Sequence, residues 1–231
     1  MRLLPLLLAN LMGAALSAQS IAFTFDDGPG ASAIHFTPRQ RNEAILGHLK
    51  AAGLHSILFL TLQKGTPDRL ALVRAWGEAG HGIGNHTVTH PHFHKTSLKA
   101  YQDEVLACDA LIRTLPGYTK RFRFTYLKEG DTAAKRDGFR IFLAAQGYLS
   151  APVSVDASDW YYNSRLEEAL EKKPGLDLDP WRKAYLNHLW DRARYYDGLS
   201  QALLGRSARH VILLHPNLVN ALFLGDAIRM F

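Results

Sequence analysis

The stretch IAFTFDDGPG, residues 21–30, joins an apolar run to two adjacent carboxylates and a Gly-Pro-Gly turn. Residues 21–25 are rich in side chains that favour β-structure and predict a buried strand. Asp26 and Asp27 repel each other at the end of such a strand unless a cation or another positive group compensates them. An aspartate can also cap a helix, but Gly28-Pro29-Gly30 follows directly and argues against a helix here. One metal ligand beside one base accounts for both charges.

Beyond this stretch, short β-like runs alternate with segments of helical periodicity. Such alternation predicts parallel β/α units and an α/β fold. The expected strands are fewer than the eight of a closed barrel, so a distorted, incomplete (β/α) barrel fits best. One domain is expected over residues 21–231, without internal repeats. Strands are expected near residues 21, 56, 81, 121, 148 and 210, and helices over 38–52, 67–79, 98–115, 132–146, 164–172, 180–204 and 219–230.

The composition is that of a single globular domain. The chain has 231 residues, of which 47% are hydrophobic, enough for one substantial core but cramped for two domains. The net charge is +6, yet no basic run or Lys/Arg stripe stands out, so we predict a mildly basic surface and no nucleic-acid partner. The one cysteine, Cys108, excludes an internal disulfide and lies in a helical pattern, as a buried core residue would.

Residues 1–20 have the pattern of a secretory signal peptide. Arg2 precedes an apolar run over residues 3–16, and small residues follow. Two cleavage sites fit, at residues 15–17 and 18–20, and an uncleaved N-terminal anchor is the alternative. Both interpretations place the working part outside the cytoplasm, secreted or periplasmic. No other segment is long and apolar enough to cross a membrane.

Polar and aromatic groups follow nearly every predicted strand. In parallel β/α folds the reactive groups stand at the carboxyl ends of the strands, where they share one rim. The groups expected at this rim are Asp26 and Asp27; His86 and His90, with His92 and His94 beyond; Arg123 and Tyr126; Asp156, Asp159 and Trp160; and His215.

The segment HTVTH supplies two imidazoles, His86 and His90, four residues apart. On a helical turn this spacing places both rings on one face, as metal sites use. The pair alone is a weak signal, because the chain has 11 histidines. Together with an aspartate from another strand end it forms a three-ligand set with open positions, which is the pattern of a catalytic metal site. His92 and His94 are expected to be non-ligands.

His215 follows the apolar run at residues 211–214. A histidine there is either a satisfied core residue or a general acid, since an imidazole pKa lies near neutrality. A carboxylate must orient it in the second case, and Asp156 and Asp159 are both available.

Five motifs in this order resemble the polysaccharide deacetylases, the NodB-homology enzymes of carbohydrate esterase family 4. The resemblance covers residues 21–229 and implies a distorted, incomplete β/α barrel. It also implies metal-dependent hydrolysis of an N-acetyl group on an amino sugar, most often with zinc. The motifs are TFDDGP (24–29), HTVTH (86–90), RFTY (123–126), DASDW (156–160) and LLH (213–215).

The resemblance also implies a ligand set and a base. Asp27, His86 and His90 would hold one divalent metal ion, Zn²⁺ in most of the family, which lowers the pKa of a bound water and polarises the acetyl carbonyl. Asp26 would be the general base, kept ionised and oriented by Arg123.

The remaining motifs imply an acid, an oxyanion donor and an acyl pocket. The backbone N–H of Tyr126 would bind the oxyanion, and His215, held by Asp159, would protonate the leaving amine. Trp160 and Leu213 would form an apolar wall around the acetyl methyl group.

The sequence departs from the family pattern in three places. Thr125 stands where the family has a proline that would stiffen the loop, and Leu-Lys-Glu-Gly follows Tyr126. Pro216-Asn217 follows His215, where an aspartate often stands. Residues 161–209 form a long helical insertion, whose aromatic side chains either stack on sugars or belong to the core.

We therefore expect a metal-dependent hydrolase that removes N-acetyl groups from an amino-sugar polysaccharide or oligosaccharide, chitin-like or peptidoglycan-like. An alternative keeps the metal chemistry but acts on a non-sugar C–N amide bond, for which the altered loop after Tyr126 leaves room. A third hypothesis, a degenerate carbohydrate-binding protein, is disfavoured because Asp26 and His215 accompany a complete ligand set.

Overall fold

The computed structural model describes residues 20–62 and 67–231. Residues 1–19 of the predicted signal peptide lie outside this part. No helix within the described ranges is long and apolar enough to cross a bilayer.

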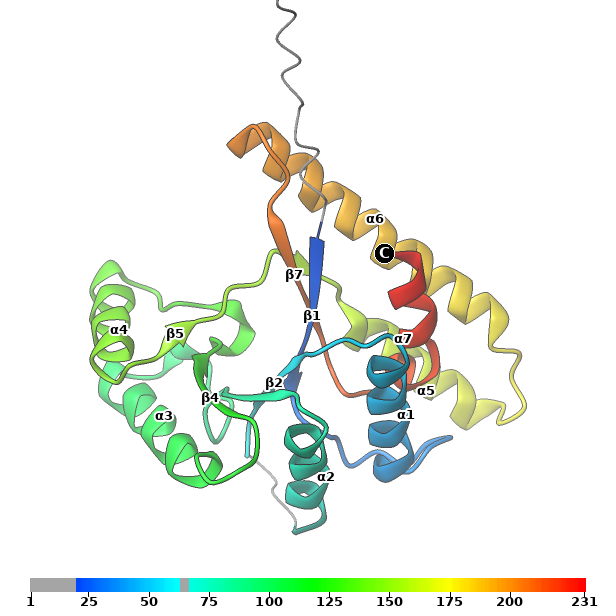
Figure 1. Ribbon diagram of the computed structural model, residues 1–231, viewed down its shortest axis with the longest axis horizontal. Coiled ribbons are helices and arrows are strands. Elements are labelled where there is room, and N and C mark those ends of the chain that lie inside the picture. The colour runs from blue at the N-terminus through cyan, green and yellow to red at the C-terminus, as the bar shows by residue number, and fades with distance from the viewer. Residues whose placement is uncertain (1–19, 63–66) are drawn as a thin grey trace, which may run out of the picture.

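Seven parallel strands form one curled sheet in the order β5-β4-β3-β2-β1-β7-β6 (Figure 1). The edge strands β5 and β6 do not pair with each other in the described chain, so the barrel is incomplete and the predicted fold class is confirmed. The strands are β1 Ser20–Asp27, β2 Ile57–Leu60, β3 Gly82–Asn85, β4 Tyr118–Phe122, β5 Leu149–Ser150, β6 Val155–Asp156 and β7 Arg209–Leu214.

Every predicted helix is present, and most begin at a side-chain cap. Thr37 and Gln40 form a capping box, and Ser97, Thr132 and Asn217 accept backbone N–H groups at the starts of three other helices. The helices are α1 Pro38–Ala51, α2 Pro67–Glu78, α3 Leu98–Ile112, α4 Ala133–Ala145, α5 Asp159–Lys172, α6 Asp179–Leu204 and α7 Leu218–Met230, with short 3₁₀ helices η1 Phe93–Lys95 and η2 Thr125–Leu127.

Two strand predictions and one helix boundary need correction. The strand expected at residues 148–155 is divided into β5 and β6, and Pro152, which has no N–H for a ladder, lies in the break. The strand expected at residues 121–125 ends earlier, at Phe122, because the chain turns into η2. Helix α5 starts at Asp159 rather than residue 164, because Asp156 Oδ1 accepts the Ser158 N–H at 3.0 Å and turns the chain there.

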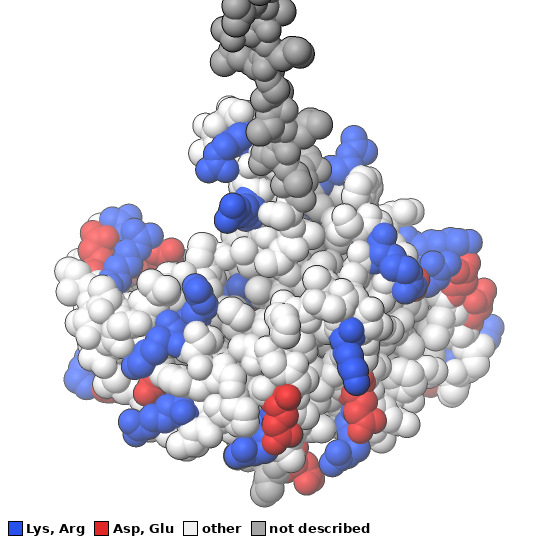
Figure 2. Space-filling model, in the orientation of Figure 1, with Lys and Arg blue, Asp and Glu red and all other residues white. Residues whose placement is uncertain are grey.

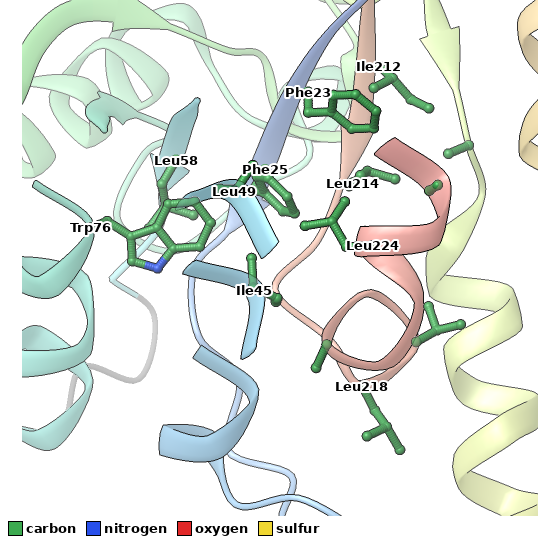
Figure 3. Packing of buried hydrophobic residues seen from close by; sticks show 14 of the residues in the cluster. Phe23, Phe25, Ile45, Leu49, Leu58, Trp76, Ile212, Leu214, Leu218 and Leu224 are labelled. Atoms are coloured by element: carbon green, nitrogen blue, oxygen red, sulfur yellow. The ribbon is translucent and has the colours of Figure 1, made fainter. Parts of the chain in front are cut away.

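The main core packs the sheet against α1, α2 and α7, whose side chains converge on Phe25 of β1 (Figure 3), and also takes in buried residues of α3, α5 and α6. The rings of Phe25 and Trp76 meet edge to face at 5.1 Å. Trp76 Nε1 donates to Asn42 Oδ1 at 2.7 Å, so this buried indole N–H is satisfied. Cys108 is fully buried in the same core, as predicted.

A second, aromatic core fills the space between β4 and helices α3 and α4. It contains Phe93, Tyr101, Phe122, Phe124, Phe139, Leu143 and Tyr148, together with Val105. On the outside, basic side chains are scattered among acidic and uncharged ones over the face shown in Figure 2. That face carries no continuous basic stripe of the kind that tracks a nucleic-acid backbone.

Candidate active site

Asp27, His86 and His90 bring three ligand atoms together at the carboxyl end of the sheet. Asp27 Oδ1 lies 3.4 Å from His90 Nε2 and 3.6 Å from His86 Nε2, and the three form a group that could hold a metal ion. Ligands about 2.1 Å from one tetrahedral ion lie about 3.4 Å from each other, so the spacing fits. Asp27 Oδ1 is also buried without a hydrogen-bond partner in the described structure. The donor set therefore suits a divalent metal ion.

Hydrogen bonding and burial orient the two imidazoles toward Asp27. His86 Nδ1 lies 2.8 Å from the Arg123 carbonyl, which can only accept, so Nδ1 donates there and Nε2 is the ring nitrogen that faces Asp27. Burial lowers the pKa of His90; Asp27 opposes the effect, His86 adds to it, and the net pKa lies below the usual histidine value. A lowered pKa keeps this imidazole neutral.

The two histidines do not lie on a helical turn, contrary to the expectation from their spacing. Residues 86–90 form an irregular loop in which Thr87 (φ 69°) and His90 (φ 55°) are left-handed. Asn85 Oδ1 accepts the Thr87 N–H at 3.0 Å, and Thr87 Oγ1 accepts the His90 N–H at 3.2 Å. These local bonds, rather than a helix, bring the two rings to 4.9 Å.

Glu104 of α3 braces this loop from outside the cavity. Its Oε2 accepts the backbone N–H groups of Val88 at 2.9 Å and Thr89 at 2.7 Å, and its Oε1 accepts the Thr89 hydroxyl at 2.8 Å. This role could not be predicted from the sequence, because a glutamate on an amphipathic helix ordinarily belongs to a solvated face.

Asp26 lies beside the ligand cluster of Asp27, His86 and His90, and Arg123 holds its carboxylate. Both side chains are almost fully buried, and Arg123 Nη1 donates to Asp26 Oδ1 at 2.7 Å. The guanidinium is itself fixed by Thr24 Oγ1 at 2.8 Å and by the ring of Phe59, 4.1 Å away. Asp26 Oδ2 lies 3.7 Å from His86 Nε2, so the carboxylate borders the ligand cluster.

His215 and Asp159 form a second polar pair beside the ligand cluster. Asp159 Oδ1 lies 2.7 Å from His215 Nδ1, and Oδ2 accepts the His215 backbone N–H at 2.7 Å. Burial alone lowers the pKa of His215, but the charge and hydrogen bond of Asp159, with the charges of Asp27 and Asp26, outweigh it and raise the pKa to about 10. The imidazole is therefore protonated at neutral pH, with Nε2 3.9 Å from Asp27 Oδ2. Of the two carboxylates left open by the sequence, Asp159 contacts His215.

Two asparagines complete the Asp159 site and were missed by the sequence analysis. Asn217 Nδ2 and Asn220 Nδ2 donate to Asp159 Oδ2 at 2.9 and 2.7 Å. Asn217 belongs to the Pro216-Asn217 pair that follows His215, and its side chain also caps α7. With the two donors of His215 and these two amides, the fully buried Asp159 carboxylate has four hydrogen-bond donors and needs no further partner.

A cavity of about 590 Å³ opens over these groups. Arg123 and Asp159 do not line the cavity. Arg123 contacts Asp26 and Asp159 contacts His215, and these two partners do line it. His92 and His94 do not line it either; His92 stacks on Tyr126 at 5.0 Å. The lining residues are Asp26, Asp27, His86, His90, Tyr126, Leu127, Lys128, Asp156, Trp160, Leu213 and His215.

The backbone around the cavity is strained. Of the non-glycine residues with positive φ in the described chain, all except His35 lie in or beside the site. Such conformations persist where surrounding structure holds them and cluster at functional sites. They are Asp27, Thr87, His90, Tyr126, Leu127 and Ser158.

Comparison with known proteins agrees with this geometry. The family model described as polysaccharide deacetylase matches residues 13–141. A peptidoglycan-N-acetylglucosamine deacetylase of Bacillus cereus is 30% identical over 141 residues, 61% of this chain and 46% of that protein. The chain thus spans about half the length of this curated relative.

Solved structures share the fold at low identity. A family 4 carbohydrate esterase from Streptomyces lividans, in complex with acetate, has a TM-score of 0.58 and 23% identity, covering 91% of this chain and 84% of that one. A polysaccharide deacetylase from Bacillus cereus has a TM-score of 0.65 and 21% identity, covering 91% and 86%. A CE4 family pseudoenzyme from Bacillus anthracis has a TM-score of 0.62 and 15% identity, covering 92% and 60%.

Proposed function

The chain belongs to the polysaccharide deacetylase family, and from this premise we propose that it is a metal-dependent hydrolase of N-acetyl groups on an amino-sugar polymer or oligomer. One observation carries the proposal. The ligand cluster of Asp27, His86 and His90 has the Asp26–Arg123 pair beside His86, and His215 with Asp159 beside Asp27. Hydrolysis of an amide needs a base for the water and an acid for the amine, and the cavity offers one of each.

Asp27, His86 and His90 would hold one divalent ion, for which we propose Zn²⁺. When bound, such an ion lowers the pKa of a water molecule and polarises a carbonyl. The unpartnered Asp27 Oδ1 and the hydrogen bond that orients the His86 ring support this ligand set.

Asp26 takes the proton of the attacking water in this proposal. Its contact with Arg123 orients the carboxylate and offsets its charge. His215 then gives a proton to the leaving amine, a role supported by the charge and hydrogen bond of Asp159, which raise the pKa of the imidazole.

The backbone N–H of Tyr126 is the proposed donor to the carbonyl oxygen as that oxygen gains charge. Trp160 and Leu213 are proposed to enclose the acetyl methyl group. Both line the cavity; Leu213 is buried and Trp160 exposed, so Trp160 also offers a ring face to a sugar.

The substrate class rests on the relatives. The curated relative is named for peptidoglycan N-acetylglucosamine, so we propose a peptidoglycan-like or chitin-like substrate, met outside the cytoplasm after export by the N-terminal segment. A non-sugar amide is the second candidate. It is favoured by Leu127 and Lys128, which enter the cavity wall from the loop that departs from the family pattern.

Acetate release tests the proposal. Purified protein is incubated with N-acetylated chitooligosaccharides, peptidoglycan, acetylated xylan and simple acetamides, before and after treatment with a chelator. We expect release from an N-acetylated sugar, loss with the chelator, and recovery with Zn²⁺. His86→Ala should lose both metal and activity. Release from simple amides alone would favour the second candidate, and no release from any substrate by metal-loaded protein would reject hydrolysis.

A further inference from the structure

The segment that carries Tyr126 is held in an unfavourable conformation. Tyr126 has φ 55° and ψ 17°, and Leu127 also has φ 55°. Two consecutive left-handed residues that are not glycine need support from their surroundings. Leu127 and Lys128 both make short-range bonds within η2, to the carbonyls of Phe124 and Thr125, but these bonds do not join the segment to the rest of the fold.

Thr125 provides that link. It is fully buried, and its hydroxyl donates to the Pro91 carbonyl. The same oxygen lies 2.8 Å from Tyr101 Oη, and the Thr125 N–H donates to Tyr101 Oη at 3.2 Å. Because the threonine proton is used on Pro91, the proton in the 2.8 Å bond comes from Tyr101. Thr125 and Tyr101 therefore form a reciprocal pair in which each donates to the other.

Tyr101 is a rigid anchor for this pair. It lies on α3 with no exposed surface, its ring stacks on Phe93 at 4.1 Å, and Phe139 meets its edge at 5.0 Å. Burial raises the pKa of Tyr101 to about 12, an effect that the bonds to Thr125 only partly oppose. The hydroxyl therefore keeps its proton at any ordinary pH.

The other end of the link reaches the ligand loop. Pro91 directly follows His90, and the ring of Tyr126 packs against His90 at 4.5 Å. One buried hydroxyl group thus ties the segment of Tyr126 both to α3 and to the loop that carries a ligand of the candidate metal site.

We propose that Thr125 and Tyr101 are positioning residues that fix the backbone N–H of Tyr126 relative to His90; this rests on the proposed function, in which that N–H stabilises the reacting carbonyl oxygen. The family's proline stiffens this loop through its ring, whereas this chain does so through hydrogen bonds. A proline at position 125 would have neither the N–H nor the hydroxyl, and would leave the buried Tyr101 hydroxyl without both of its partners.

Three single variants, the double variant Thr125→Val/Tyr101→Phe and one control variant test the pair. Thr125→Val removes the hydroxyl but keeps the shape and the N–H, Tyr101→Phe removes the other hydroxyl, and Thr125→Ser retains the bonds. Tyr118→Phe is the matched control, since it removes a tyrosine hydroxyl bonded to Asp109 at the start of β4. For each variant, kcat, KM, bound metal and the melting temperature are measured.

We expect Thr125→Val and Tyr101→Phe to lower kcat by about 10- to 100-fold with KM changed less than about threefold, because the lost contribution belongs to the transition state. Thr125→Ser, which retains the hydrogen bonds, should have a kcat within about threefold of the wild-type value. The double variant should be no worse than either single variant, since the residues act as one unit. Unchanged kcat in Thr125→Val, a rise in KM alone, or loss of metal with kcat would each overturn the proposal.

A second measurement does not depend on turnover. Amide hydrogen exchange over residues 123–128 should be faster in Thr125→Val and Tyr101→Phe than in wild type, Thr125→Ser or Tyr118→Phe. If the wild type proves inactive on every substrate, the proposed function fails, while this exchange pattern still supports the anchoring of the segment. Equal exchange in all variants overturns the anchoring whether or not the protein is a deacetylase.

Discussion

Replacing Asp26 with asparagine tests the division of labour between the two adjacent aspartates. Asparagine keeps the shape of the side chain and one oxygen for Arg123 Nη1, which now lies 2.7 Å away. It removes the negative charge and with it the capacity to accept a proton from water. The ligands Asp27, His86 and His90 are untouched, so bound metal should stay at the wild-type level.

Two magnitudes follow from the structure. A positioned general base contributes about 10²- to 10⁴-fold, so kcat should fall by that factor, or about 2.7–5.4 kcal/mol in the barrier. Breaking a buried ion pair costs about 3–5 kcal/mol, and we expect the lower end, about 3 kcal/mol, because Arg123 keeps its hydrogen bond. Arg123 is only 1% exposed, so water cannot replace the lost charge.

The assay combines acetate release, metal content and urea unfolding on the same preparations. Asp156→Asn is the matched control, because Asp156 lines the same cavity but its carboxylate bonds to the Ser158 backbone instead of Arg123. We expect less than a tenfold effect on kcat there. A value of kcat within threefold of wild type in Asp26→Asn, at equal metal content, would refute the base assignment.

Three further outcomes are expected. Glu104→Gln should weaken metal binding in calorimetry by about 10- to 100-fold, whereas Asp103→Asn, on the exposed face of the same helix, should not. Asp109→Asn should cost about 1–3 kcal/mol in urea unfolding at pH 7. Burial raises the pKa of Asp109, but hydrogen bonds and Lys120 hold the net pKa below its usual value, so this cost should begin to shrink as the pH falls below about 4 and vanish only below the pKa of the folded state. Gly28→Ala should lower both stability and metal content, because φ is 93° and the new Cβ would lie 2.7 Å from Leu60 Cδ1.

The sequence predicted those parts of the site that follow from local pattern. Strand ends share one rim in a parallel β/α fold, so His86 and His90 could be grouped with one of the two adjacent aspartates from the pattern, and the family resemblance implied that this one is Asp27. The choice between Asp156 and Asp159 as the partner of His215 could not be made from the residues alone, because it depends on the turn at Ser158 where α5 begins.

The missed residues share a physical cause. Three of them, Glu104, Tyr101 and Asn220, lie on helices. On a helix, the pattern predicts that a polar residue is exposed and that a tyrosine belongs to the core. Their roles come from contacts across the chain, such as the bond from Asn220 to Asp159, 61 residues away. Such pairings depend on how helices are placed against the sheet, and neither periodicity nor composition encodes that placement.

The adjacent aspartates serve one cavity because the strand breaks its own alternation. In a regular strand successive side chains point to opposite faces, so Asp26 and Asp27 would be separated by the sheet. Asp27 instead adopts φ 72° and Gly28 φ 93°. The result is that Asp26 Oδ2 and Asp27 Oδ1 lie 3.7 and 3.6 Å from the same atom, His86 Nε2.

This strained turn has its own supports. The Gly28 N–H donates to the Asp26 carbonyl at 2.9 Å, and Arg69 donates to the Asp27 carbonyl. Glycine is needed at position 28 because a side chain there would be strained and would meet Leu60. The motif IAFTFDDGPG therefore combines three requirements: a buried strand, two carboxylates with different partners, and a turn that brings both to one side. A substitution that restored regular strand geometry at Asp27 would separate the proposed base from the metal ligand while leaving both residues in the sequence.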